Sequence, residues 1–262
     1  MPFAFQALIL FVAGGIAGII NSMAGGGILV SFPALVFSGA SAINAAATSK
    51  FSLLVGGMGS LWSYRHEFAT QKRWAWRFAP PSLLGGLFGA ILLLYTGEAR
   101  FRSIVPYLIL FATALFILQP AVSRWLQIEA DTIQHSRFGF TLALFFQFCV
   151  GLYAGYFGAG IGILMLAALG ILGQKNIHEM NSLKVLLGSL MNGMAAVYFG
   201  IQGNILWPEA LVVAAGALAG GYLGPKLARR LGPAAVRTFV SIVGLGIGLY
   251  FLLQQITTGC VM

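Results

Sequence analysis

Ala24-Gly25-Gly26-Gly27-Ile28-Leu29 is the stretch that decides the fold of this chain, and it recurs as Ala159-Gly160-Ile161-Gly162-Ile163-Leu164. Each copy follows an apolar run of helical length and opens a shorter apolar run. A glycine-rich break in a membrane helix frees backbone N–H and C=O groups, which is tolerated only where protein or a cavity surrounds them. The two copies therefore predict two interior helix breaks, each followed by a half-helix.

The two copies belong to a repeat that runs the length of the chain. Its other ordered matches are Gly14-x-x-x-Gly18 with Gly151-x-x-x-Gly155, Lys50 with Lys184, Tyr64 with Tyr198, Gly85-Gly86-x-x-Gly89 with Gly220-Gly221-x-x-Gly224, and Arg102 with Arg237. The offset between matched positions is almost constant, shortest for the lysine and tyrosine pairs and slightly longer for the first glycine pair. A near-constant offset over this many ordered matches is not chance, so the two halves are versions of one unit.

The composition requires lipid as the solvent for most of the surface. Hydrophobic residues make up 59% of the 262 positions, charged residues make up 8%, and the mean hydropathy is +0.90. A soluble domain carries about 25% charged residues. We therefore predict a multi-pass protein of the cell (inner or plasma) membrane. The net charge of +9 does not indicate nucleic-acid binding, because the basic residues are scattered through short connections rather than gathered in a soluble domain.

Five apolar segments can be drawn in each half, and most approach the ~20 residues that a helix needs to cross the hydrocarbon core. They are Phe3–Ser22, Gly27–Gly39, Ala42–Tyr64, Trp74–Tyr95 and Phe101–Leu118, then Phe138–Phe157, Ile161–Leu172, Asn181–Phe199, Leu206–Leu227 and Val236–Leu253. The second segment of each half reaches only about 20 Å, so it is a re-entrant arm or a half-helix. We predict an all-α polytopic membrane protein, with a first membrane repeat over residues 1–119, a polar connector over 120–137 and a second membrane repeat over 138–262.

The charges of the connecting loops predict that the repeats are inverted. Basic residues follow Tyr64 and surround Leu227, whereas the loop 200–204, which corresponds to the one after Tyr64, has no charge. The basic residues concerned are Arg65, Lys72, Arg73, Arg77, Lys226, Arg229 and Arg230. Because cytoplasmic loops carry the excess of Lys and Arg, equivalent loops lie on opposite faces, as in many secondary transporters. Arg100 and Arg102 go against this trend, since the topology leaves them on the outer face.

The glycine breaks and two lysines are the candidate ligand-binding features. A half-helix that starts after the glycines presents free N–H groups and a positive dipole end, which suit an anion; the alternative is a tight turn without a ligand. Lys50 and Lys184 lie within or at the start of apolar spans, among hydroxyl and amide neighbours. A lysine inside the membrane is costly and often functional. The alternative is that each lysine snorkels to the interface.

The residues around the first break resemble one membrane family. The run Ala17-Gly18-Ile19-Ile20-Asn21-Ser22-Met23-Ala24-Gly25-Gly26-Gly27, then Phe32-Pro33-Ala34-Leu35, then Ala47-Thr48-Ser49-Lys50 is similar to the sulfite exporter TauE/SafE family over nearly the whole chain. Ala47 and Ser49 stand where that family often has Gly and Asn. The second-half run from Tyr153 to Gly162 is also similar. The resemblance implies a permease for small organic or inorganic sulfur-containing anions, such as sulfite or sulfonates, with either direction of transport.

We therefore predict a secondary transporter for small anions rather than an enzyme, since no nucleotide-binding, hydrolase or metalloenzyme motif is present in the sequence. No cofactor, metal or nucleic acid is expected. The expected partners are the anionic substrate and the lipid bilayer, and the sequence leaves open whether the chain forms a homodimer. A passive anion channel or uniporter and a non-transporting membrane scaffold are the alternatives. The predicted substrate-binding residues are Asn21, Ser22, Gly25, Gly26, Gly27, Thr48, Ser49, Lys50, Gly158, Gly160, Gly162, Asn181, Ser182 and Lys184.

Overall fold

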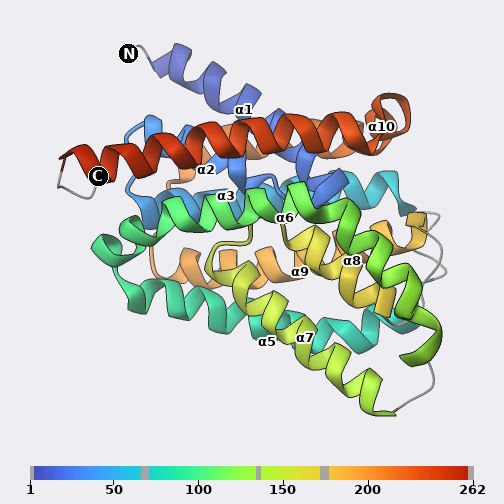
Figure 1. Ribbon diagram of the computed structural model, residues 1–262. Coiled ribbons are helices and arrows are strands. Elements are labelled where there is room, and N and C mark those ends of the chain that lie inside the picture. Colours follow the sequence, from blue (N-terminus) through green and yellow to red (C-terminus); the bar gives the residue numbers. More distant parts are fainter. Residues whose placement is uncertain (1–2, 66–70, 134–136, 172–176, 259–262) are drawn as a thin grey trace.

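The computed structural model describes residues 3–65, 71–133, 137–171 and 177–258, and this part of the chain is built from helices without strands (Figure 1). Seven stretches in it are long and apolar enough to cross a membrane. The all-α polytopic architecture is thereby confirmed. The helices are α1 (Phe3–Ala24), α2 (Ile28–Phe37), α3 (Ala42–Ser63), α5 (Lys72–Thr96), α6 (Glu98–Ile133), α7 (Arg137–Tyr156), α8 (Ile161–Ile171), α9 (Ile177–Ile201) and α10 (Trp207–Thr258).

Two of the helices extend far beyond the predicted segments. α6 continues into the predicted polar connector as far as Ile133, and α10 joins the last two predicted segments into 52 residues. Within α10, the candidate spans Trp207–Leu227 and Arg237–Thr257 remain separate. Figure 1 shows the chain curling back at the right-hand end of α10. The two spans pack on different helices: a β-carbon on Gly221 of the first span would lie 2.0 Å from Gly56 O of α3, and one on Gly244 of the second span would lie 2.2 Å from Thr113 Oγ1 of α6.

Glycines let helices from opposite halves approach to backbone contact. A β-carbon on Gly18 of α1 would lie 2.3 Å from Ala217 O of α10. The matching motif of the second half behaves alike, since a β-carbon on Gly155 of α7 would lie 2.1 Å from Gly86 O of α5. Small residues at such crossings are typical of membrane helices. Each glycine motif therefore packs against a helix of the other half.

The buried side chains reflect this exchange of helices. One core cluster draws only on α5, α7, α8 and α9 and includes Phe78, Val150, Met165 and Leu187. A larger cluster contains most of the buried hydrophobic residues of α1, α2, α3, α6 and α10. The smaller core therefore combines one helix of the first half with three of the second, and the sequence halves are not the packing units.

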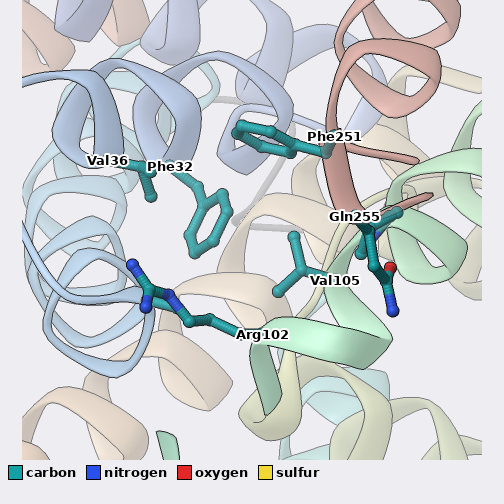
Figure 2. Close-up of a pocket in the computed structure, with 8 residues that line it drawn as sticks. Phe32, Val36, Arg102, Val105, Phe251 and Gln255 are labelled. Carbon is teal, nitrogen blue, oxygen red and sulfur yellow. The ribbon is translucent and has the colours of Figure 1, made fainter. Parts of the chain in front are cut away.

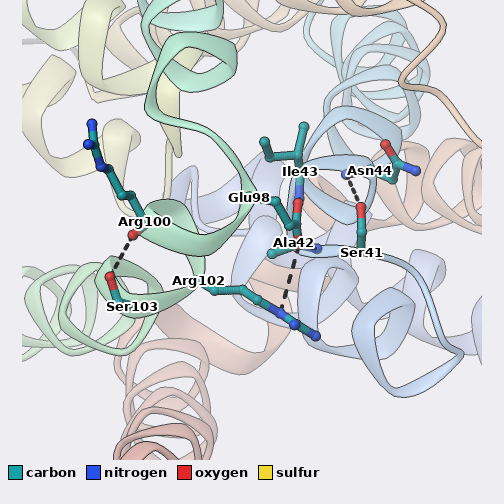
Figure 3. Close-up of polar contacts among 8 residues, drawn as sticks. All are labelled: Ser41, Ala42, Ile43, Asn44, Glu98, Arg100, Arg102 and Ser103. Atoms are coloured by element: carbon teal, nitrogen blue, oxygen red, sulfur yellow. Dashed lines mark hydrogen bonds and ion pairs between the residues drawn. The ribbon is translucent and has the colours of Figure 1, made fainter. Parts of the chain in front are cut away.

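α3 is a polar helix enclosed by other helices. It is not among the seven candidate spans, and it packs against α1, α2, α9 and α10. Its N-terminus is held by two side chains, because Ser41 Oγ accepts a hydrogen bond from Asn44 N and the Glu98 carboxylate accepts from Ala42 N at 2.6 Å and Ile43 N at 2.9 Å (Figure 3). A carboxylate at a helix N-terminus satisfies orphan N–H groups and complements the dipole. α3 is thus fixed at one end, and it carries Lys50 in its interior.

Candidate substrate-binding site

The two glycine breaks meet, backbone against backbone, inside the bundle. Gly25 has φ +69° and Gly160 has φ +75°, conformations that residues with a side chain rarely adopt. A β-carbon on Gly25 would lie 2.4 Å from Gly162 N, and one on Gly162 would lie 2.4 Å from Ala24 O. Neither glycine can be enlarged without displacing backbone. The structure therefore brings together the breaks predicted in the two halves.

Lys50 reaches from α3 of the first half to the break of the second half. Its side chain is 1% exposed. Nζ donates to Phe157 O at 2.6 Å and also to Ala154 O, both at the C-terminal end of α7. The last carbonyls of a helix lack intrahelical donors and carry the negative end of the helix dipole. The buried ammonium is therefore matched to a helix C-terminus, which it caps.

Lys184 makes the reciprocal contact from α9 of the second half to the break of the first half. Nζ donates to Met23 O at 2.7 Å and to Ser22 O at 3.4 Å, at the end of α1, and to Asn181 Oδ1 at 2.8 Å. Ser22 and Phe157, whose carbonyls accept from the two lysines, are matched positions of the repeat. Each lysine thus caps the broken helix of the opposite half.

The burial of both lysines excludes the alternative that they snorkel to the interface. Lys184 is only 3% exposed, like Lys50, and both head groups are bonded inside the bundle. An ammonium has three N–H donors. Within the described chain, Lys50 uses two of them on carbonyls, so the third is free to meet a ligand.

The polar residues beside the lysines have different tasks. Thr48 Oγ1 accepts a hydrogen bond from Leu206 N at 3.1 Å, which ties α3 to the start of α10. Ser182 Oγ donates to Glu179 O at 2.8 Å within its own helix. Ser49 Oγ is fully buried and has no hydrogen-bond partner among the described residues. Of these three hydroxyls, only that of Ser49 is unengaged.

The predicted residues before the first break contribute mainly through their backbone. Ser22 Oγ donates to Ile19 O at 2.8 Å, while its carbonyl accepts from Lys184. The carbonyl of Asn21 accepts from Gly25 N at 3.0 Å, and its side chain is half-buried. These bonds shape the turn that ends α1.

The remaining predicted glycines are confined by close neighbours. Gly158 has φ +85°, and a β-carbon on it would lie 2.5 Å from Lys50 Nζ. A β-carbon on Gly27 would lie 2.4 Å from Ala17 O. Gly27 also precedes α2 without a side-chain cap. Leu29 N and Val30 N in its first turn already donate to Gly26 O and Gly27 O, both at 3.1 Å. An anion at the start of this half-helix would therefore meet the N–H groups that precede Leu29.

Two residues at the breaks were missed by the sequence analysis. The Phe116 ring of α6 fills the space beside Gly26, where a β-carbon would lie 2.3 Å from Cζ, and it also lies 3.7 Å from one on Gly160. The sequence repeat could have revealed Phe116, because Phe116 and Phe251 occupy matched positions in it. Tyr153 OH donates to Ala159 O at 2.8 Å. Tyr153 has an isoleucine as its counterpart, so the repeat could not reveal it.

Comparison with known proteins identifies the family. The model of the sulfite exporter TauE/SafE family matches residues 10–251. The chain belongs to this family. It is 29% identical over 236 residues to a probable membrane transporter protein, YfcA, of Escherichia coli K12, covering 90% of this chain and 85% of the relative. A probable membrane transporter protein of Haemophilus influenzae is 28% identical, with 90% of each chain covered, and one of Sinorhizobium is 28% identical, with 95% and 94% covered.

Family membership and the seven apolar spans make this TauE/SafE protein a multi-pass membrane transporter of the bacterial plasma membrane. The two glycine breaks and their lysine caps lie inside the stretch that the family model matches.

Proposed function

We propose that the protein is a secondary transporter that moves small sulfur-containing anions, such as sulfite or sulfonates, by alternating access. The observation that carries the proposal is the pair of buried lysines, each placed at a glycine break where the two breaks touch. Buried cations select anions on Coulombic grounds, and broken helices add oriented dipoles. The substrate binds between Lys50, Lys184 and the backbone N–H groups that open α2 and α8.

In this proposal the substrate binds the remaining N–H of Lys50 and competes with the acceptors of Lys184, whose three N–H donors are all engaged. Each lysine links a helix of one half to the broken helix of the other half. When an anion takes over a lysine, the carbonyl loses its donor and the cap weakens. Binding therefore lowers the free energy needed to move one helix break relative to the other. Occupancy of the site is thereby coupled to a change in the side of the membrane from which the site is accessible.

The inverted arrangement of the repeats and the re-entrant course of α2 are also proposals. Gln6 Nε2 donates to Ser38 O at 3.1 Å, which supports a hairpin of α1 and α2 whose ends return to the same face. In this topology Lys72 faces the cytoplasm and Gln202 faces outward. Single cysteines at the two positions, in a background without Cys149 and Cys260, should react with an impermeant thiol reagent from opposite sides. Labelling from the same side contradicts the inverted topology.

Transport by purified protein in proteoliposomes tests the function directly. The wild type should take up sulfite or ethanesulfonate, and Lys50→Met or Lys184→Met should raise KM about 10- to 150-fold, the usual effect of losing a hydrogen bond to a charged group. Lys226→Met is the matched control, because Lys226 is exposed and donates only to Tyr222 OH among the described residues. Wild-type protein inactive toward both anions, or lysine variants as active as Lys226→Met, would refute the proposal. Uptake that is independent of a pH gradient and faster than a conformational cycle allows would favour the alternative, a passive anion channel or uniporter.

A further inference from the structure

A small apolar pocket lies beside Arg102, away from the lysine caps (Figure 2). Its lining consists of Phe32, Val36, Ala42, Arg102, Val105, Pro106, Phe251 and Gln255. Figure 2 shows the ring of Phe32 between Arg102 and Phe251. The cavity has a volume of about 20 Å³, little more than the ~10–15 Å³ that a single water needs. A methyl-sized group fits without rearrangement, whereas a lipid chain does not.

The guanidinium of Arg102 is only loosely paired. The nearest carboxylate is that of Glu98, at 3.8 Å, and the two side chains are 37% and 36% exposed. That carboxylate already accepts short hydrogen bonds from the first N–H groups of α3 (Figure 3). A guanidinium has five N–H donors, so Arg102 can bind an additional anion. In the proposed topology Arg102 lies on the outer face, whereas Lys and Arg are in excess in cytoplasmic loops, so a binding role would account for its position.

One aromatic layer separates the pocket from the Lys50 site. Phe32 is 1% exposed and forms part of the pocket wall. Its ring packs edge-on against Phe157, with centroids 5.6 Å apart, and the carbonyl of Phe157 is the acceptor of Lys50. A ligand in the pocket therefore contacts the Phe32 ring, which packs against the residue whose carbonyl is capped by Lys50.

The repeat places the same three residue types at the opposite end. Arg102, Val105 and Phe251 are matched, all at one offset, by Arg237, Val240 and Phe116. At that end, Val240 and Phe116 are fully buried, and the Phe116 ring packs on the glycine breaks. In the proposed inverted arrangement, an open pocket at Arg102 and a packed aromatic at its counterpart correspond to a protein that is accessible from one side only.

We propose that the Arg102 pocket is an outer binding station for a small organic anion, in which the anionic group pairs with Arg102 and a methyl-sized group enters the cavity. The inference rests on the proposed transport function and narrows its substrate class to organic anions with a short apolar end, such as short alkyl sulfonates. Bare sulfite has no group to fill the cavity. A lipid chain is too large for the cavity, and a lipid headgroup on Arg102 is the outcome that would overturn the proposal.

Uptake of ethanesulfonate and of sulfite should be measured side by side in proteoliposomes made with and without anionic lipid. Arg102→Gln should raise KM for ethanesulfonate about 10- to 100-fold, because a charge-assisted contact is lost. Val105→Phe fills the cavity and should lower ethanesulfonate uptake at least tenfold while sulfite uptake changes less than twofold. Arg100→Gln, a neighbouring exposed arginine outside the pocket, should behave as wild type.

The outcomes separate this inference from the proposed function. Wild-type protein inactive toward both anions refutes the transport function itself. Wild-type transport with Val105→Phe affecting both anions equally, or neither, overturns the outer station, whether or not Arg102→Gln is well folded. An effect of Arg102→Gln that disappears without anionic lipid also overturns it, because the arginine then serves a lipid headgroup.

Discussion

The two glycine breaks share a backbone plan but differ in polar support. At the second break, Lys50 donates to two carbonyls and Tyr153 OH donates to a third, that of Ala159. At the first break, Lys184 donates to Met23 O, more weakly to Ser22 O, and to the side chain of Asn181. A side-chain acceptor can turn away, whereas a helix carbonyl is fixed. We therefore expect the first break to open more readily than the second.

This difference shows which parts of a duplicated site are constrained. The glycines and the lysines occur in both copies, because close backbone approach and capping of a broken helix leave few other solutions. Tyr153 occurs in one copy only, because a single extra hydrogen bond adds rigidity without being needed for the geometry. Strict repetition therefore marks the shared framework, and the departures from it mark where the two sides of a transport cycle can differ.

The largest effect is expected from inserting a β-carbon where the two glycine breaks touch. Gly25→Ala combines a positive φ with a β-carbon 2.4 Å from Gly162 N. The left-handed conformation costs about 1–2 kcal/mol and overpacking about 1–3 kcal/mol, so the variant should lose transport and much of its thermal stability. Gly97→Ala is the control, since Gly97 has φ +75° with nothing within 4 Å of a β-carbon. Equal melting temperatures for the two variants would show that the breaks do not need close approach.

The next largest effect is expected from removing the lysine caps, and the loss of thermal stability should differ between the two lysines. Lys50→Met leaves two buried carbonyls without a donor, whereas Lys184→Met leaves one well-bonded carbonyl, Met23 O, and one weakly bonded one. An orphaned buried acceptor costs about 1–3 kcal/mol, partly offset because methionine is easier than lysine to place in the membrane. Lys50→Met should therefore have the lower melting temperature in detergent. The reverse order contradicts the view that the second break is the more firmly held.

A smaller effect is expected from the support found only at the second break. Tyr153→Phe removes the hydroxyl that donates to Ala159 O at 2.8 Å, which should cost about 0.5–1.5 kcal/mol. Tyr156→Phe is the control, because its hydroxyl makes a longer bond of 3.3 Å to Thr96 Oγ1. Chemical denaturation followed by tryptophan fluorescence measures both. No difference between the two variants means that Tyr153 does not hold the break.

The sequence predicted the helices, the breaks and the lysines, because each leaves a local signature. Apolar runs of span length marked the helices, and glycines inside them marked the breaks. It did not predict that each lysine caps a helix of the opposite half, since Lys50 and Phe157 are separated by 107 residues and no local pattern specifies such a partner. Nor did it predict the task of Thr48, whose hydroxyl binds Leu206 N. A polar residue on an interior helix has several partners within reach, and packing decides among them.

The smallest effect on stability, and a sensitive test of ligand binding, is expected at Ser49. Its hydroxyl is fully buried without a hydrogen-bond partner in the described chain, and its counterpart in α9 is Leu183, also fully buried. Burying an unpaired hydroxyl costs about 1–3 kcal/mol, so Ser49→Ala should leave the melting temperature unchanged or raise it. If the hydroxyl binds the substrate beside Lys50, the same variant should lose about two- to tenfold in affinity, as expected for a neutral hydrogen bond of ~0.5–1.5 kcal/mol.

Ser182→Ala is the matched control, because that hydroxyl donates to Glu179 O within its own helix. Ligand-induced stabilisation by ethanesulfonate, measured for both variants, separates binding from folding. Unchanged affinity in Ser49→Ala would remove this residue from the site and leave Lys50 as the only contribution of α3 to the binding of the anion.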